Sequence, residues 1–134
     1  MSSMNLDLVP YLRTNPGIAL VGATNQKEKY GNIILQDMVK KGYKIIPINP
    51  RAKEVDGLTC YPDLKAASAQ ENIGLVVYVI PPKFTLESLA EAGELGLKKV
   101  WVQPGAGDDA VRDYLEGNGF EFLMDACVMV ETPQ

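Results

Sequence analysis

The sequence predicts an α/β fold in which a doubly wound, mostly parallel sheet lies between two layers of helices. Short apolar runs rich in β-branched residues alternate with amphipathic segments along the chain, which is typical of repeated strand–helix units. The runs are apolar at nearly every position, as expected of strands that are covered on both faces. We therefore expect a three-layer sandwich.

Five strands are expected, each a short apolar run. They span residues 18–21, 43–48, 75–80, 100–102 and 120–124. Because crossovers between parallel strands are right-handed, we expect the strand order to run outward from the first strand in both directions, as in a 3-2-1-4-5-6 sheet. The point at which the winding reverses then lies beside the first strand.

Helices are expected where apolar residues recur at helical spacing between the strands. The clearest covers residues 31–42 and ends in two lysines and a glycine, as a helix carboxyl end prefers. Two further crossover helices are expected over residues 86–97 and 111–117. Weaker patterns predict a helix over residues 63–69 after a short strand at 58–60, and an amino-terminal helix over 6–12.

Length and composition favour a single domain over residues 1–134. A chain of 134 residues, 46% of them hydrophobic, is enough for one ordinary core. The net charge of −4 lacks the basic excess expected of a nucleic-acid partner. No stretch approaches the roughly 20 apolar residues of a membrane span, and the chain begins without a signal-peptide pattern, so a cytoplasmic protein is expected.

The chain has no histidine and two cysteines, which excludes several kinds of site. Without histidine there is no Ser-His-Asp or Cys-His nucleophile system, and two cysteines alone cannot close a tetrahedral zinc site. No catalytic residue and no metal ligand is therefore assigned. The simplest interpretation of Cys60 and Cys127 is that each is a small buried side chain.

The loop after the first strand has the features of an anion site. Gly22 and Ala23 allow a ligand to approach the main chain, Thr24 offers a hydroxyl, and the following helix presents free N–H groups. Lys27 and Lys29 add positive charge, although both also suit a solvated loop. The segment matches neither the G-x-G-x-x-G fingerprint nor the P-loop.

The turn after the second strand reads Asn49-Pro50-Arg51. Domains that bind NAD usually place an acidic residue at this strand end to hold the ribose hydroxyls. An arginine instead favours a phosphate, since the guanidinium forms two parallel hydrogen bonds with a phosphomonoester. The 3′-phosphate of coenzyme A and the 2′-phosphate of NADP both suit it. A solvated turn arginine is the alternative.

The third long strand ends in Ile80-Pro81-Pro82, with Phe84 soon after. Two prolines form a stiff apolar wall without backbone N–H donors, which suits contact with an adenine ring or a pantetheine arm. Alternatively, the prolines end the strand and begin the next helix. Both interpretations can hold together.

Taken together, these motifs resemble the stand-alone CoA-binding domain family, which is related to the amino-terminal domain of the succinyl-CoA synthetase alpha subunit. The matching segments cover nearly the whole chain in order: residues 18–24, 29–31, 46–51, 61–64, 81–82, 101–105 and 124–131. The resemblance implies a Rossmann-like fold with coenzyme A as the ligand. It supplies no reaction, because the synthetase depends on a phosphorylated histidine from a second domain.

Carried over by position, the resemblance implies roles for three segments. The first loop would contact phosphate and ribose, the Asn-Pro-Arg turn the nucleotide end, and the Pro-Pro turn the adenine or pantetheine. With their neighbours, the candidate binding residues are Gly22, Ala23, Thr24, Asn25, Lys29, Tyr30, Gly31, Asn49, Pro50, Arg51, Ile80, Pro81, Pro82 and Phe84.

The sequence is most consistent with a protein that binds coenzyme A or an acyl-CoA without catalytic apparatus of its own. An NADP-dependent oxidoreductase is one alternative, although little chain remains for a substrate site. A CoA-binding subunit of an acyl-CoA synthetase-like complex is another, docking through the loop at residues 101–107 or the tail at 128–130. A homo-oligomer also stays open. Cys127, just past the last strand, could form a mixed disulfide with the coenzyme A thiol.

Overall fold

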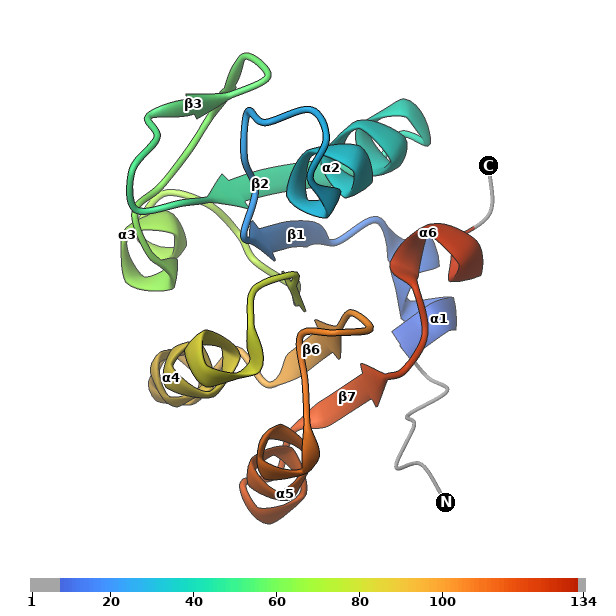
Figure 1. Ribbon diagram of the computed structural model, residues 1–134, viewed down its shortest axis with the longest axis vertical. Coiled ribbons are helices and arrows are strands. Elements are labelled where there is room, and N and C mark those ends of the chain that lie inside the picture. Colours follow the sequence, from blue (N-terminus) through green and yellow to red (C-terminus); the bar gives the residue numbers. More distant parts are fainter. Residues whose placement is uncertain (1–7, 133–134) are drawn as a thin grey trace.

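A five-stranded parallel sheet forms the centre of the computed structural model, which describes residues 8–132 (Figure 1). Its strands are β1 Gly17–Val21, β2 Lys44–Ile48, β5 Leu75–Tyr78, β6 Lys99–Val102 and β7 Glu121–Met124. They correspond to the five predicted runs, with ends that differ by one or two residues. The α/β, doubly wound prediction is confirmed.

The strand order is β2-β1-β5-β6-β7, so the winding reverses beside β1 as expected. Val21 at the end of β1 pairs with Ile48 of β2 on one side and with Tyr78 of β5 on the other. Three consecutive long strands therefore end at the same edge of the sheet. This is where doubly wound sheets bind their ligands.

Helices cover both faces of the sheet (Figure 1). On one face lie α3 Leu64–Ser68, α4 Pro82–Glu94 and α5 Asp109–Gly117. On the other lie α1 Leu8–Tyr11, α2 Tyr30–Lys40 and α6 Val128–Glu131. The predicted helices over 31–42, 63–69, 86–97 and 111–117 are all present with shifted ends. The predicted helix over 6–12 appears as α1 and a 3-10 turn, Leu12–Thr14, while residues 6 and 7 lie outside the described residues.

The core is divided by the sheet into two apolar clusters. Ile18 and Leu20 pack with the helices of the α2 face, whereas Ala19 and Val21 pack with those of the α4 face. This alternation follows from the two-residue period of a strand, and it explains why β1 is apolar at every position. Trp101 is fully buried in the α2-side cluster.

The short strand predicted at 58–60 does not extend the parallel sheet. The structure instead forms a separate antiparallel hairpin from β3 Glu54–Val55 and β4 Leu58–Thr59. Tyr61, just after it, makes a single parallel bridge to Ile48 at the edge of β2. The edge beside β2, which the expected 3-2-1-4-5-6 order assigns to its third strand, is therefore occupied by this single bridge. The hairpin itself turns at Asp56 and Gly57, both with positive φ.

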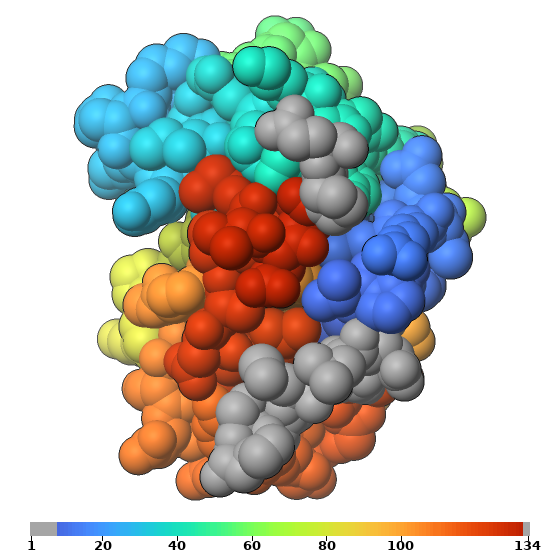
Figure 2. Space-filling model, turned by 90° about the vertical axis from the view of Figure 1, so that its right-hand side faces the viewer, coloured from blue at the N-terminus to red at the C-terminus, as the bar shows by residue number. Residues whose placement is uncertain are grey.

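The carboxyl-terminal helix closes the α2 face. Figure 2 shows it (red) lying between α2 (teal) and α1 (blue). The Lys41 ammonium donates to the Met129 carbonyl at 2.7 Å, and the Trp101 indole N–H donates to the Ala126 carbonyl at 2.8 Å. These two bonds position the residues just after β7.

Candidate functional site

The loops after β1, β2 and β5 begin side by side at the carboxyl edge. The Gly22 N–H donates to the Ile48 carbonyl at 3.1 Å, and the Val79 N–H donates to the Val21 carbonyl at 3.0 Å. The parallel pairing therefore continues one residue beyond the strands on both sides of β1. Each loop leaves the sheet from a fixed point.

Two glycines allow the β1 loop to pack tightly. A Cβ on Gly22 would lie 2.7 Å from Val79 and 2.9 Å from Ile80, and its φ of +109° is rarely adopted by other residues. A Cβ on Gly31 would overlap the Gly22 carbonyl oxygen. From the sequence, the small residue at 22 is expected to let a ligand approach the main chain. The structure shows a packing requirement as well, which sets α2 against the end of β1.

Asn49 connects the loops that follow β1 and β2. Its side-chain N–H donates to the Ala23 carbonyl at 2.8 Å, and its Oδ1 accepts from the Arg51 N–H at 2.8 Å. The Ala23 side chain is fully buried in the core, and the contact with Asn49 is made by the Ala23 carbonyl. One partly buried amide therefore holds the start of the first loop next to the turn that carries Arg51.

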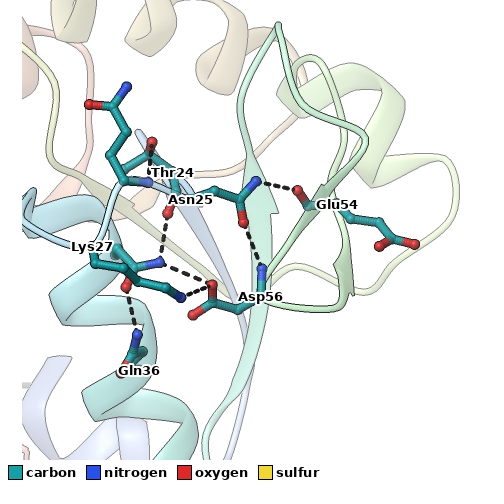
Figure 3. Close-up of polar contacts among 8 residues, drawn as sticks. Thr24, Asn25, Lys27, Gln36, Glu54 and Asp56 are labelled. Carbon is teal, nitrogen blue, oxygen red and sulfur yellow. Dashed lines mark hydrogen bonds and ion pairs between the residues drawn. The ribbon is translucent and has the colours of Figure 1, made fainter.

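Asn25 joins the same loop to the β3–β4 hairpin (Figure 3). Its amide N–H donates to the Glu54 carbonyl at 2.8 Å, and its Oδ1 accepts from the Asp56 N–H at 3.0 Å. Both ends of this side chain are used in pairing with backbone. The role that the structure gives Asn25 is to fix the loop and the hairpin relative to each other.

Lys27 pairs with Asp56 in this network (Figure 3). The ammonium lies 2.6 Å from the carboxylate, which also accepts from the Asn32 amide at 3.2 Å. The hydrogen bond from Lys27, followed by that from Asn32, outweighs desolvation and lowers the pKa of Asp56 below its ordinary value. The positive charge of Lys27, which the sequence suggested for a phosphate, is therefore paired with the Asp56 carboxylate.

Lys29 and Arg51 are the two candidate cations that remain for a phosphate. Both are exposed, and neither forms an ion pair with another described residue. Lys29 is also the N-cap residue of α2, and its side chain makes no capping hydrogen bond. By contrast, Asp63 and Asp108 cap α3 and α5 through their carboxylates. The first turn of α2 thus presents N–H groups toward the loop without a side-chain acceptor.

A cavity of about 490 Å³ opens beside the Pro-Pro turn. One wall is formed by residues 79–82 and the other by residues 103–106, with Tyr30, Ile34 and Cys127 closing the sides. Most of these side chains are apolar. Two smaller hollows, of about 330 and 270 Å³, lie near the amino ends of the strands, away from the edge where such sheets bind ligands.

The structure confirms one interpretation of the proline pair, and contact of the prolines with a ligand stays a prediction. Pro81 is the N-cap residue of α4 and Pro82 its first residue, so the pair ends the strand segment and begins the helix. Pro81 and Pro82 also form part of the cavity wall. Phe84, named as a candidate from the sequence, is half exposed and does not line this cavity.

Gln103 was not among the predicted site residues. It follows β6, lines the cavity and is only 7% exposed. Its position directly after a strand at the carboxyl edge is a signal that the sequence contained. The expectation that residues 101–107 form an exposed docking loop is wrong at Trp101, which is fully buried, as the core interpretation of this residue held.

The described residues contain neither a membrane-spanning helix nor a cluster of metal ligands. No helix there is both long and apolar enough to cross a membrane. Within the same part of the chain, no group of three or more Cys, Asp or Glu side chains is placed to hold a metal ion.

The structure brings three of the predicted segments together at one edge: Gly22–Gly31, Asn49–Arg51 and Ile80–Pro82. Which of these residues touch a ligand stays a prediction.

Comparison with known proteins gives consistent matches. The sequence model of a family described as "CoA binding domain" matches residues 17–133. The alpha subunit of ADP-forming acetate–CoA ligase II from Pyrococcus furiosus is 33% identical over 71% of this chain, which spans 21% of that subunit. The uncharacterized protein YneT from Bacillus subtilis is 28% identical, with 89% of this chain and 87% of YneT aligned.

Among solved structures, a conserved hypothetical protein from Pyrococcus furiosus superposes with a TM-score of 0.82 and 44% identity. The alignment covers 87% of this chain and 99% of that protein. Similar proteins thus occur both as chains of about this length and as small parts of much longer ligases.

Proposed function

The chain belongs to the CoA-binding domain family, and we propose that it binds coenzyme A or an acyl-CoA at the carboxyl edge of its sheet. The observation that carries this proposal is the position of Asn49, which holds the Ala23 carbonyl and the Arg51 N–H at 2.8 Å each. The loop after β1, which is the candidate anion site, is thereby held next to the backbone of Arg51, the candidate phosphate ligand. An adenosine that carries phosphates at two positions can use both the loop and the arginine.

The phosphates are proposed to lie against the first turn of α2. This turn has no side-chain cap, and the Lys29 ammonium is exposed beside it. Free N–H groups and the positive end of the helix dipole both favour an anion. Arg51 is proposed to hold the 3′-phosphate, because its guanidinium can form two parallel hydrogen bonds with that group.

The pantetheine arm is proposed to follow the apolar wall formed by Ile80, Pro81 and Pro82. Neither proline has an N–H group that would compete for hydrogen bonds, and all three residues line the cavity. The ligand then runs from the β1 loop across the end of β5 toward Gln103. The NADP-dependent alternative gains no support, since the enzymes among the relatives are named as CoA ligases.

Melting temperature with four ligands tests this proposal. Coenzyme A at about 100 times its Kd should stabilise the protein by about 2.7 kcal/mol, a rise of several degrees. Dephospho-CoA should give a smaller rise, and NADPH and NAD little or none. In Arg51→Ala, coenzyme A and dephospho-CoA should become equivalent. The control, Arg13→Ala, removes an exposed arginine near the amino end of β1 and should keep the difference.

Two results would contradict the proposal. One is a larger rise with NADPH than with coenzyme A. The other is a preference for coenzyme A over dephospho-CoA that survives in Arg51→Ala but not in Arg13→Ala, because the phosphate would then be held elsewhere.

A second candidate is a CoA-binding subunit whose catalytic groups come from another protein. It is supported by the 33% identity to a ligase subunit and by the 21% of that subunit's length that the chain spans. Isolation from native extract under mild conditions tests it. A stable complex with a second protein would support the subunit role, and recovery as a free chain that still binds coenzyme A would contradict it.

A further inference from the structure

The two cysteines occupy different environments. Cys60 is 7% exposed within the α2-side cluster, where burial raises the pKa of its thiol. Cys127 is partly exposed and lines the cavity beside the Pro-Pro turn. The buried-thiol interpretation therefore holds for Cys60 alone. Of the two cysteines, only Cys127 lines the cavity at the carboxyl edge.

Gln103 fixes the direction of the Cys127 sulfur. Its Oε1 accepts from the Val128 N–H at 2.7 Å, so its Nε2 is the atom that faces Cys127 Sγ, at 3.4 Å. The amide cannot be reversed without leaving the Val128 N–H opposite an N–H. A donor directed at sulfur has the polarity that a reacting thiolate needs.

The cavity provides the second, independent indication of a ligand. A concave apolar space with a few polar groups is the usual form of a small-molecule site, and this one has Gln103 and Cys127 at its side. The space connects the Ile80–Pro82 wall with the Cys127 sulfur. If coenzyme A binds as proposed above, its pantetheine arm enters along that wall and its own sulfur ends in the cavity.

We infer that this cavity is a site of thiol–disulfide exchange, in which Cys127 reacts with coenzyme A disulfides. The inference rests on the proposed function. The Cys127 thiolate attacks one sulfur of CoA–S–S–CoA, the original S–S bond breaks, and a Cys127–S–S–CoA bond forms. The second coenzyme A leaves as a thiolate and takes up the proton that Cys127 lost. The disulfide is transferred, so no further oxidant is needed.

Intact mass and peptide mapping of the reduced, full chain test this inference. Coenzyme A disulfide should add one coenzyme A, located on the peptide that contains Cys127, and reductant should remove it. The reaction should be at least about tenfold faster than with glutathione disulfide at equal concentration, because binding raises the local concentration of the reacting sulfur. Cys60→Ser should react as the wild type does, and Cys127→Ser should gain no adduct. Peptide mapping of the wild type gives the location even if a variant folds poorly.

The melting temperature with reduced coenzyme A separates failure of this inference from failure of the proposed function. If coenzyme A raises the melting temperature but Cys127 gains no adduct, the exchange site is wrong and the binding function stands. Equal rates with the two disulfides, or an adduct on Cys60, would also overturn the exchange site. If coenzyme A gives no rise, the proposed function is wrong.

Discussion

The loop after β1 and the cavity beside the Pro-Pro turn lie at the same edge of the sheet but are built from different chemistry. Asn25, Asn49 and the Lys27–Asp56 pair tie the loop to its neighbours with hydrogen bonds of 2.6 to 3.0 Å. The cavity walls are mainly proline, isoleucine and small residues around about 490 Å³ of space. A polar, pre-organised loop suits the charged end of a ligand, and an apolar space suits its flexible arm.

The difference also concerns tolerance to substitution. In the loop, the backbone at Gly22 and Gly31 leaves no room for an added methyl group, and the side-chain amides of Asn25 and Asn49 each have two partners. In the cavity, a substitution changes volume more than it breaks bonds. Variants of the loop should therefore lose both stability and nucleotide binding, with effects that can be ordered by the contacts they remove.

The largest effect is expected for Gly31→Ala. The added Cβ would overlap the Gly22 carbonyl, so α2 must move away from the end of β1, at a cost of about 1–3 kcal/mol or more. Gly93→Ala is the matched control, because its Cβ, in the last turn of α4, would lie at an ordinary 3.6 Å from Phe120. It should be neutral or stabilising by up to about 1 kcal/mol. Urea unfolding measures both, and equal losses in the two variants would contradict the close-packed loop.

A smaller effect is expected for Asn49→Ala. This change leaves the Ala23 carbonyl and the Arg51 N–H without their partner and should cost about 1–2 kcal/mol of stability. It should also weaken coenzyme A binding, as measured by calorimetry. Asn118→Ala, which removes one exposed hydrogen bond to the Tyr114 carbonyl far from this edge, should leave affinity unchanged. An unaltered Kd in Asn49→Ala would show that the link between the loops does not form the site.

The smallest effect is expected for Asp56→Asn, and it should depend on pH. The folded state lowers the pKa of Asp56 from 3.8, so its carboxylate adds stability above that pH and loses it as pH falls through the folded value. The pair with Lys27 is partly exposed, and about 0.5 kcal/mol is expected at pH 7. The difference in urea midpoint from wild type should shrink below about pH 4. Asp113→Asn, an exposed site without an ion pair to a described residue, should show no such dependence.

The sheet was predictable because its signal is local. A strand buried on both faces must be apolar throughout, and runs such as residues 18–21 and 75–80 show this directly. The β3–β4 hairpin was not predicted correctly, since each strand has two residues and its position depends on Asn25, about 30 residues earlier. A contact over that separation leaves no periodic pattern in the sequence.

The candidate site was predictable in its position but less so in its contacts. The rule that ligands bind at the carboxyl ends of strands located Gly22, Asn49 and Pro81 at one edge, as the structure has them. It also applied to Gln103, which the sequence argument passed over. The pairing of Lys27 with Asp56 and the overlap between Gly31 and Gly22 depend on tertiary packing, so only coordinates reveal them.

The most direct test of the central claim is an NMR titration of the ¹⁵N-labelled protein with the two halves of coenzyme A. Adenosine 3′,5′-bisphosphate should shift the amide signals of residues 22–29, Asn49 and Arg51, and pantetheine should shift those of Val79, Ile80, Gln103, Gly105 and Ala106. Each fragment should leave the other set nearly unchanged. Shifts centred on the amino ends of the strands, or the same residues responding to both halves, would contradict the account.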